Sequence, residues 1–277
     1  MSLRARQDAE ETLSVIKMEV AMTEIEPTKR FTERVADYVA YRPKYPAAVL
    51  EFMRAELNLR PSSIIADVGS GPGILTEMFL RNGNTVFAVE PNEAMRAAAE
   101  NLLGAFPNFK SVDGMAEATT LDARSVDFVT AAQAFHWFDA GRALAEFARI
   151  LKDGGWVALL WNMRRTDSTP FLRELERILR AYGTDYERVA ADNPGQELME
   201  RIFPRGFGTK RFRHEQVFDY AGLRGRWLSA SYVPLAGHPN HEPMFDALRR
   251  AFDEHNTDGT VVIEYDTVLY YSQLSKV

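Results

Sequence analysis

The feature that most constrains the fold of this chain is an alternation of short apolar segments with helical segments between residues 64 and 161. Each apolar segment has four to six residues and the composition of a buried strand. Strands that alternate with helices are joined by crossover connections and pair in parallel. The pattern predicts an α/β fold with a doubly wound, mostly parallel sheet. The expected strands are Ile64–Val68, Val86–Val89, Phe109–Val112, Val126–Thr130 and Trp156–Trp161.

Capping residues and glycines indicate where the intervening helices begin and end. A helix is expected from Ile74 to Arg81, another is expected to begin at Pro91, and a third follows Asp139, whose side chain can cap a first turn. Gly154 and Gly155 are expected to end this third helix just before the fifth strand.

The flanking segments define the expected domain organisation. Helical spacing of apolar residues is found before the first strand, and Arg211–Phe218 and Val261–Tyr271 alternate as strands do. Pro170 is expected to begin a helix that Gly183 ends. The expected parts are an N-terminal extension (1–30) and a single domain (31–277) made of lid helices (31–60), a core (61–161), a cap insertion (162–210) and the last two strands (211–277).

Composition excludes several classes of protein. The chain of 277 residues has no cysteine, which excludes disulfide scaffolds, thiolate metal sites and cysteine nucleophiles. Its formal charge of −6 disfavours a general nucleic-acid binder. The longest apolar run has six residues, against the roughly 20 that a bilayer requires, and no signal peptide is evident. A cytoplasmic protein without membrane or nucleic-acid partners is expected.

A glycine-rich turn follows the first strand and carries most of the functional information. Gly69, Gly71 and Gly73 lie between this strand and a helix, where backbone can approach a ligand closely. Glu90 ends the second strand, 21 residues after Gly69, where a carboxylate can accept both ribose hydroxyls. A nicotinamide or flavin site would require glycine at the sixth position of the motif, where this chain has Ile74. An adenosine-containing ligand is favoured over a dinucleotide.

Two further strands end beside this turn. Asp113 and Met115 follow the third strand, and Gln133 precedes an aromatic loop, residues 135–138, after the fourth. Because ligands bind outside the carboxyl ends of the strands in open α/β sheets, these positions are expected to form one site.

These segments resemble the motifs of class I S-adenosylmethionine-dependent methyltransferases. The glycine turn, Glu90, Asp113-Gly114 and the Lys152–Gly155 stretch match in order. The Tyr38–Pro46 segment and the Gln133–Trp137 loop are similar to a narrower branch, the small-molecule methyltransferases that include trans-aconitate methyltransferases and generically described type 11 proteins. The match covers residues 31–161 well.

The resemblance implies a seven-stranded sheet of order 3-2-1-4-5-7-6 with strand seven antiparallel. It implies S-adenosylmethionine as cofactor, S-adenosylhomocysteine as product and no metal. Tyr38 and Arg42 would close over the cofactor, with Arg42 facing its carboxylate, and Glu90 would hold the ribose. The implied cofactor-binding residues are Tyr38, Arg42, Gly69, Ser70, Gly71, Gly73, Glu90, Met95, Asp113, Gly114, Met115, Gln133 and Ala134.

The methyl acceptor is less constrained. Arginines in the segments expected to cover the pocket suit a carboxylate, so O-methylation of a small carboxylic acid is the leading hypothesis. A carboxylate needs no general base, whereas a phenol or quinone would, and His136 is then either the base or a pocket wall. The candidate acceptor residues are Tyr41, Phe135, His136, Trp137, Arg164, Arg226 and Tyr232.

Other possibilities stay open. A cofactor-binding sensor or assembly protein without catalysis would share the same motifs. A metal is not expected, because Asp127 has no companion acids, and His238 and His241 have no third ligand and are expected to face solvent. The oligomeric state is not indicated by the sequence.

Overall fold

The structure is a computed structural model that describes residues 35–187 and 196–274. The expected N-terminal extension, residues 1–30, lies outside the described residues. None of the helices in the described ranges is long and apolar enough to cross a membrane.

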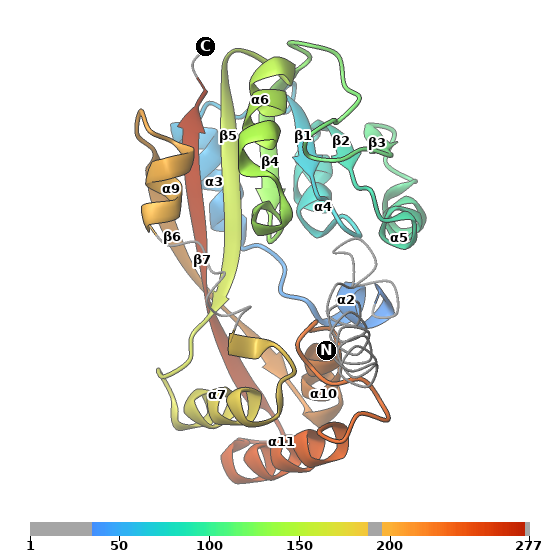
Figure 1. Ribbon diagram of the computed structural model, residues 1–277, viewed down its shortest axis with the longest axis vertical. Coiled ribbons are helices and arrows are strands. Elements are labelled where there is room, and N and C mark those ends of the chain that lie inside the picture. The colour runs from blue at the N-terminus through green and yellow to red at the C-terminus, as the bar shows by residue number, and fades with distance from the viewer. Residues whose placement is uncertain (1–34, 188–195, 275–277) are drawn as a thin grey trace, which may run out of the picture.

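The centre of the molecule is a seven-stranded sheet with the order β3-β2-β1-β4-β5-β7-β6 (Figure 1). The first five strands pair in parallel, and β7 pairs antiparallel with both β5 and β6. This confirms the predicted fold class and strand order. The strands are β1 Ile64–Val68, β2 Thr85–Val89, β3 Phe109–Val112, β4 Val126–Ala132, β5 Leu151–Arg164, β6 Gly208–Phe218 and β7 Val261–Gln273.

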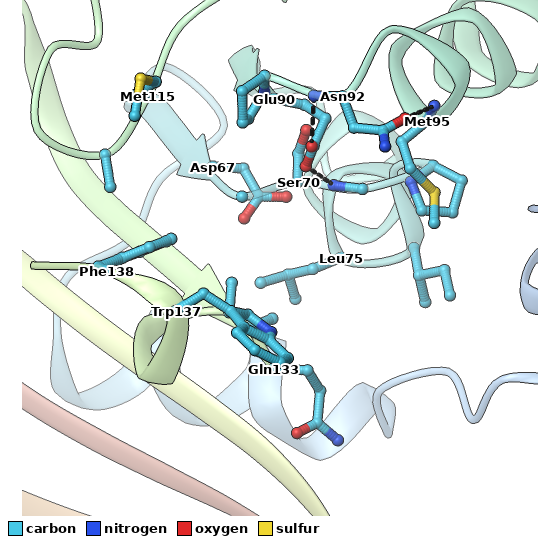
Figure 2. Close-up of a pocket in the computed structure, with 18 of the residues that line it drawn as sticks. Asp67, Ser70, Leu75, Glu90, Asn92, Met95, Met115, Gln133, Trp137 and Phe138 are labelled. Atoms are coloured by element: carbon cyan, nitrogen blue, oxygen red, sulfur yellow. Dashed lines mark hydrogen bonds between the residues drawn. The ribbon is translucent and has the colours of Figure 1, made fainter. Parts of the chain in front are cut away.

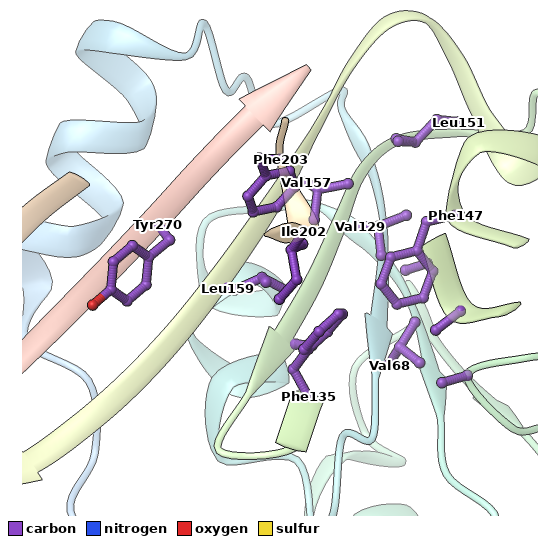
Figure 3. Close-up of a cluster of buried hydrophobic side chains, with 14 of the residues drawn as sticks. Val68, Val129, Phe135, Phe147, Leu151, Val157, Leu159, Ile202, Phe203 and Tyr270 are labelled. Carbon is purple, nitrogen blue, oxygen red and sulfur yellow. The ribbon is translucent and has the colours of Figure 1, made fainter. Parts of the chain in front are cut away.

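Helices cover both faces of the sheet. One apolar cluster packs side chains of α3 and α4 against one face. The other face packs against α6 and α9 through Phe147, Ile202 and Phe203 (Figure 3). The helices are α2 Val35–Tyr41, α3 Ala47–Glu56, α4 Ile74–Arg81, α5 Glu93–Leu103, α6 Ala140–Ile150, α7 Pro170–Tyr182, α9 Gln196–Ile202, α10 Tyr220–Leu228 and α11 His241–His255.

Side-chain caps explain the starts of α5, α6, α7 and α10. The Asp139 side chain accepts a hydrogen bond from the backbone N–H of Arg142, and Pro170 stands at the first position of α7, as predicted. The prediction for α5 was wrong by two residues. This helix begins at Glu93 because the Asn92 side chain accepts from the backbone N–H of Met95.

The prediction that Gly154 and Gly155 end a helix was also wrong. Helix α6 ends at Ile150, and β5 begins at once with Leu151. The pairing of β4 with β5 moves from Val126–Leu151 to Phe128–Trp156, so three extra residues bulge out of β5. The prediction failed because the segment 152–155 consists of polar residues and glycines, which is typical of a helix end. Its conformation is decided instead by the pairing of Leu151 and Trp156 with β4.

A cap lies beyond the carboxyl ends of the parallel strands. The helices α7, α10 and α11 pack with the ends of β6 and β7 in a separate apolar cluster (Figure 1). The cap therefore draws on residues 219–260 as well as on the connection between β5 and β6. His241, expected to face solvent, begins α11 and is 5% exposed, and its Nδ1 lies 2.8 Å from the carbonyl oxygen of Pro234.

Helix α2 lies between the sheet and the cap and docks on α10 (Figure 1). The Tyr41 ring packs against Gly225, where a Cβ atom would lie 2.2 Å from Tyr41 Cε2. Gln216 Nε2 donates to the Tyr41 carbonyl oxygen at 3.3 Å, and Arg42 Nη2 donates to that of Ser229 at 2.9 Å. Since α2 contains no fully buried side chain, these contacts fix its position.

Replacement of Gly225 by alanine tests this docking. Alanine favours a helix by about 1 kcal/mol over glycine, but here its methyl group would collide with Tyr41. We expect Gly225→Ala to lower the melting temperature in a thermal unfolding scan. Gly141→Ala in α6 is the matched control, because the nearest atom to its Cβ is 3.6 Å away. Equal stabilisation by both alanines would contradict the docking.

Candidate functional site

A cavity of about 410 Å³ opens at the carboxyl ends of β1, β2, β4 and β5, next to α2 (Figure 2). Its size is that of a small-ligand pocket. It lies where the strand order reverses between β1 and β4, the usual binding position in such sheets. The cavity is called the main cavity below. The predicted site residues that line it are Tyr38, Arg42, Gly69, Ser70, Gly71, Glu90, Met95, Met115, Gln133, Ala134 and Trp137.

The three glycines of the turn differ in what they do. All three have positive φ angles of 55–88°. A Cβ at Gly69 would lie 2.7 Å from the Ala134 Cβ, whereas a Cβ at Gly71 would meet open space. Gly73 does not line the main cavity, and a Cβ there would lie 2.4 Å from Leu103 Cδ1. Gly71 faces open space, Gly69 allows the segment after β4 to approach the turn closely, and Gly73 allows α4 to pack against α5.

Glu90 is held at the rim of the turn by two backbone N–H groups. Its Oε2 accepts from Gly71 at 2.9 Å, and its Oε1 accepts from Asn92 at 2.9 Å (Figure 2). Burial raises the pKa of Glu90, and these two hydrogen bonds oppose the rise. Each oxygen keeps a free lone pair. The carboxylate can therefore accept further hydrogen bonds from a ligand without moving.

Asp67 is a buried cavity residue that the sequence analysis did not select. Its two oxygens accept from the hydroxyls of Thr76 at 2.6 Å and Thr130 at 2.8 Å. Burial raises its pKa to about 6, since it outweighs these hydrogen bonds, and the charge of Glu90 adds to the rise. A carboxylate held in this way can attract a cationic ligand group. A signal was present, because Asp67 is a charged residue in an otherwise apolar strand, two residues before the glycine turn.

The wall opposite the turn comes from β4 and β5. Gln133 has a φ of 55°, a strained conformation for a residue other than glycine, and its Nε2 donates to the carbonyl oxygen of Asn162 at 3.0 Å. Asn162 also lines the main cavity and donates to the Pro43 carbonyl oxygen at 3.2 Å. Sequence reasoning missed Asn162, because it ended the fifth strand at Trp161 and assigned residue 162 to the cap insertion, whereas β5 continues to Arg164. The other lining residues that it missed include Tyr45, Leu75, Asn92, Ala116, Glu117 and Arg142.

The residues after β3 divide into two groups. Met115 lines the main cavity with 54% of its surface exposed, as expected for a side chain that a flat ligand could cover. Asp113 does not line the main cavity, because its carboxylate pairs with Arg96 at 3.1 Å. Gly114 does not line it either, since it packs against Val89 and Thr119.

The aromatic loop also divides. Trp137 and Phe138 line the main cavity, whereas Phe135 is 2% exposed and packs in the core near Phe147 (Figure 3). His136 does not line the main cavity, and its ring lies 4.8 Å from the Trp137 ring. The position of His136 gives no support to a role as general base.

The predicted acceptor residues of the cap lie together, but around a second, smaller cavity. Arg164, Arg226 and Tyr232 line this space of about 10 Å³, which holds no more than one water molecule. Arg164 is paired with Glu176 at 2.6 Å. Tyr41 lines neither cavity and packs on α10 instead.

Asp127 has a structural role. It accepts a hydrogen bond from the backbone N–H of Ile64 at 2.7 Å and pairs with Lys152 at 3.0 Å. Among the described residues, no group of three or more His, Cys, Asp or Glu side chains is placed to hold a metal ion.

Comparison with known proteins identifies the class. A family model described as a methyltransferase domain matches residues 66–159. An uncharacterized methyltransferase of Schizosaccharomyces pombe is 34% identical over 253 residues, which cover 88% of this chain and 97% of the relative. An uncharacterized methyltransferase of Mycobacterium tuberculosis is 35% identical over 165 residues, which cover 59% of this chain and 65% of that one.

The fold has a match among solved structures. A candidate type II methyltransferase from Anaeromyxobacter dehalogenans superposes on this chain with a TM-score of 0.61 at 24% sequence identity. The superposed region covers 84% of this chain and 98% of that protein. The chain belongs to the class I S-adenosylmethionine-dependent methyltransferase family.

The main cavity fits this cofactor chemically. Gly71 leaves backbone accessible, Glu90 offers hydrogen-bond acceptors, and the buried Nε atom of Arg42 has no hydrogen-bond acceptor among the described residues. A nucleoside with a charged amino-acid tail can use all three features.

Replacement of Glu90 tests its contact with the ribose. Glutamine has the same shape, but its amide nitrogen cannot accept from a ribose hydroxyl or a backbone N–H. We expect Glu90→Gln to raise the Kd for S-adenosylhomocysteine by about tenfold or more in calorimetric titration. Glu93→Gln is the control, because Glu93 is exposed three residues away on α5. Unchanged affinity in Glu90→Gln would remove Glu90 from this role.

The raised pKa of Asp67 predicts a pH dependence of cofactor binding. Above pH 6 its carboxylate is charged and attracts the sulfonium of S-adenosylmethionine, and below about pH 6 it binds a proton and loses this attraction. Calorimetry should show that affinity for S-adenosylmethionine falls between pH 7.5 and pH 5. S-adenosylhomocysteine lacks the sulfonium charge and should lose less. An equal loss for both ligands would argue against Asp67 as the cause.

Proposed function

We propose that this protein transfers the methyl group of S-adenosylmethionine to an oxygen atom of a small carboxylic acid. The observation that carries the proposal is the arrangement of charge around the main cavity. Carboxylates of Asp67 and Glu90 line the part formed by the glycine turn, and Arg42 lines the part next to the cap. The first two suit the cationic and hydroxyl groups of the cofactor. Arg42 has five N–H donors, so it can bind the cofactor's carboxylate and still favour the carboxylate of an acceptor beside it.

The cofactor is positioned by residues from four strand ends. Glu90 would accept from the ribose hydroxyls, and Met95 and Met115 would pack against the adenine. Gly69, Ser70 and Gly71 would lie along the methionine portion, and Gln133 and Ala134 would close the opposite wall. Asp113 and Gly114 are left out of this set, because they lie outside the main cavity.

The chain's own contribution to the reaction is alignment and exclusion of water. When bound, S-adenosylmethionine supplies an activated methyl group, and transfer to a carboxylate oxygen leaves a methyl ester and a neutral thioether with no proton to remove. Tyr38, Trp137 and Phe138 are aromatic wall residues that would keep water from the methyl group. Helix α2, docked on the cap, would cover the bound ligands.

An acid is preferred to a phenol or quinone as acceptor because methylation of a carboxylate requires no general base. A general base contributes about 10²- to 10⁴-fold to catalysis where one is needed, and it must lie within hydrogen-bond reach of the acceptor. His136, the candidate base from the sequence, lies outside the residues that line the main cavity. An acid acceptor makes the position of His136 unimportant for the reaction.

The first test is calorimetric titration with S-adenosylmethionine and S-adenosylhomocysteine, with NADH as control. Binding of both S-adenosyl compounds and not of NADH is expected. Formation of S-adenosylhomocysteine is then measured with panels of small carboxylic acids, phenols and quinones. Turnover with acids that His136→Ala retains would support the proposal.

Other outcomes of this experiment separate the alternatives. Turnover only with phenols or quinones, lost in His136→Ala, would replace the acid by those acceptors. Cofactor binding without turnover on any panel would favour a sensor or assembly protein. Failure to bind the cofactor would overturn the proposed function.

A further inference from the structure

Two arginine side chains lie close together where the main cavity meets the cap. Arg42 lines the main cavity, and Arg226 on α10 lines the second cavity. Both contact Ser229, since Arg42 Nη2 donates to its carbonyl oxygen at 2.9 Å and Arg226 Nη1 donates to its hydroxyl at 3.3 Å. Burial lowers the pKa of Arg42, and the positive charge of Arg226 lowers it further. The two guanidinium groups therefore repel each other in a poorly hydrated place.

No described carboxylate balances these charges. The groups that face the pair are tyrosines: Arg42 lies over the Tyr38 ring at 4.7 Å, and Arg226 Nε donates to the Tyr265 hydroxyl at 3.1 Å. Within the described ranges, neither arginine forms an ion pair. Arg164 in the same cap is different, because its guanidinium is paired with Glu176 at 2.6 Å.

Both guanidiniums have unused hydrogen-bonding capacity. Arg226 is 7% exposed, and its hydrogen bonds within the described residues, to Tyr265 and Ser229, use two of its five N–H donors. The Nε atom of Arg42 is buried and has no acceptor there. Buried charges in proteins are normally paired, since desolvation without a partner costs free energy. Two adjacent buried cations are therefore an arrangement that a bound anion would stabilise.

We propose that Arg226, supported by the neighbouring charge of Arg42, binds the carboxylate of the methyl acceptor. This inference rests on the proposed function, because it assigns the acceptor of the same site. The planar fork of a guanidinium matches a carboxylate, and its charge keeps the acid ionised, the form with a nucleophilic oxygen.

The placement of the pair indicates where the acceptor lies. The second cavity has room for no more than one water molecule, so the body of the acceptor lies on the main-cavity side of the pair. Arg42 lines the cavity proposed for the cofactor, whereas Arg226 does not. Arg226 is therefore the residue whose loss distinguishes acceptor binding from cofactor binding.

The experiment uses the full chain saturated with S-adenosylhomocysteine, so that the carboxylate of the cofactor is already bound. The melting temperature is recorded against increasing sodium succinate, citrate and benzoate, with sodium chloride at matched ionic strength and neutral succinamide as controls. Wild type is compared with Arg226→Gln and with Arg224→Gln. Arg224 lies on the same helix, is exposed and keeps its charge away from the pair.

At least one carboxylate should raise the melting temperature of the wild type and of Arg224→Gln, but not of Arg226→Gln. Affinity of Arg226→Gln for S-adenosylhomocysteine should stay within about twofold of wild type, which also shows that the variant is folded. If Arg226→Gln does not fold, Arg226→Lys replaces it, and the acids should bind more weakly because an ammonium lacks the fork geometry.

Three results would overturn the inference. The first is that no acid acts beyond the effect of sodium chloride. The second is that carboxylates still raise the melting temperature of Arg226→Gln. If Arg226→Lys is used instead, the corresponding result is a rise as large as that of the wild type. The third is a loss of S-adenosylhomocysteine affinity of about tenfold or more in a folded Arg226 variant, which would assign the pair to the carboxylate of the cofactor. Failure of the wild type to bind S-adenosylhomocysteine at all is a separate result, because it contradicts the proposed function itself.

Discussion

The buried carboxylate of Asp67 connects the fold to the site. It is the next-to-last residue of β1, at the point where the strand order reverses, and it accepts hydrogen bonds from Thr130 on β4 and Thr76 on α4. These two bonds join the end of β1 to β4, with which it also pairs through the backbone, and to α4 behind the glycine turn. The main cavity lies directly beyond this junction. The same carboxylate is poorly solvated, which is why its pKa is raised to about 6 and why it can respond to a ligand's charge.

The sheet and the grouping of residues at the main cavity could be predicted because local sequence largely decides them. β-branched residues favour strands, glycines permit the positive φ angles of the turn, and Asp139 caps the first turn of α6. Parallel pairing then brings Glu90, Met115 and Gln133 to one edge. Asp113 was misplaced for a reason outside its own segment, since Arg96 on α5 draws its carboxylate away. Asn162 was missed because it lines the main cavity only as a result of strand lengths. β4 ends at Ala132, opposite Leu160, and β5 continues beyond it to Arg164.

The cap could not be predicted to the same extent. Its core combines α7 from one connection with α10 and α11 from another, so no single segment contains the pattern. The apolar spacing of Met244, Leu248 and Ala251 is helical, but Pro243 nearby obscures it, although proline is tolerated in a first turn. The close approach of Tyr41 to Gly225 joins residues far apart in the chain. A glycine within a helix has no visible purpose until the ring that covers it is known.

The distribution of charge explains how one cavity can serve two ligands. A site for a cationic cofactor and an anionic acceptor has to keep the acids and the arginines apart, because direct pairing would neutralise both. Here the backbone N–H groups of Gly71 and Asn92 hold Glu90, and threonine hydroxyls hold Asp67, so neither carboxylate accepts a hydrogen bond from Arg42 or Arg226. Arg42 and Arg226 are in turn surrounded by tyrosines and Ser229. Because the two acids and the two arginines all have neutral partners, each charged group stays available to a ligand. The cost is that charges of the same sign are buried close together. A bound ligand of opposite charge reduces this cost on its own side of the main cavity.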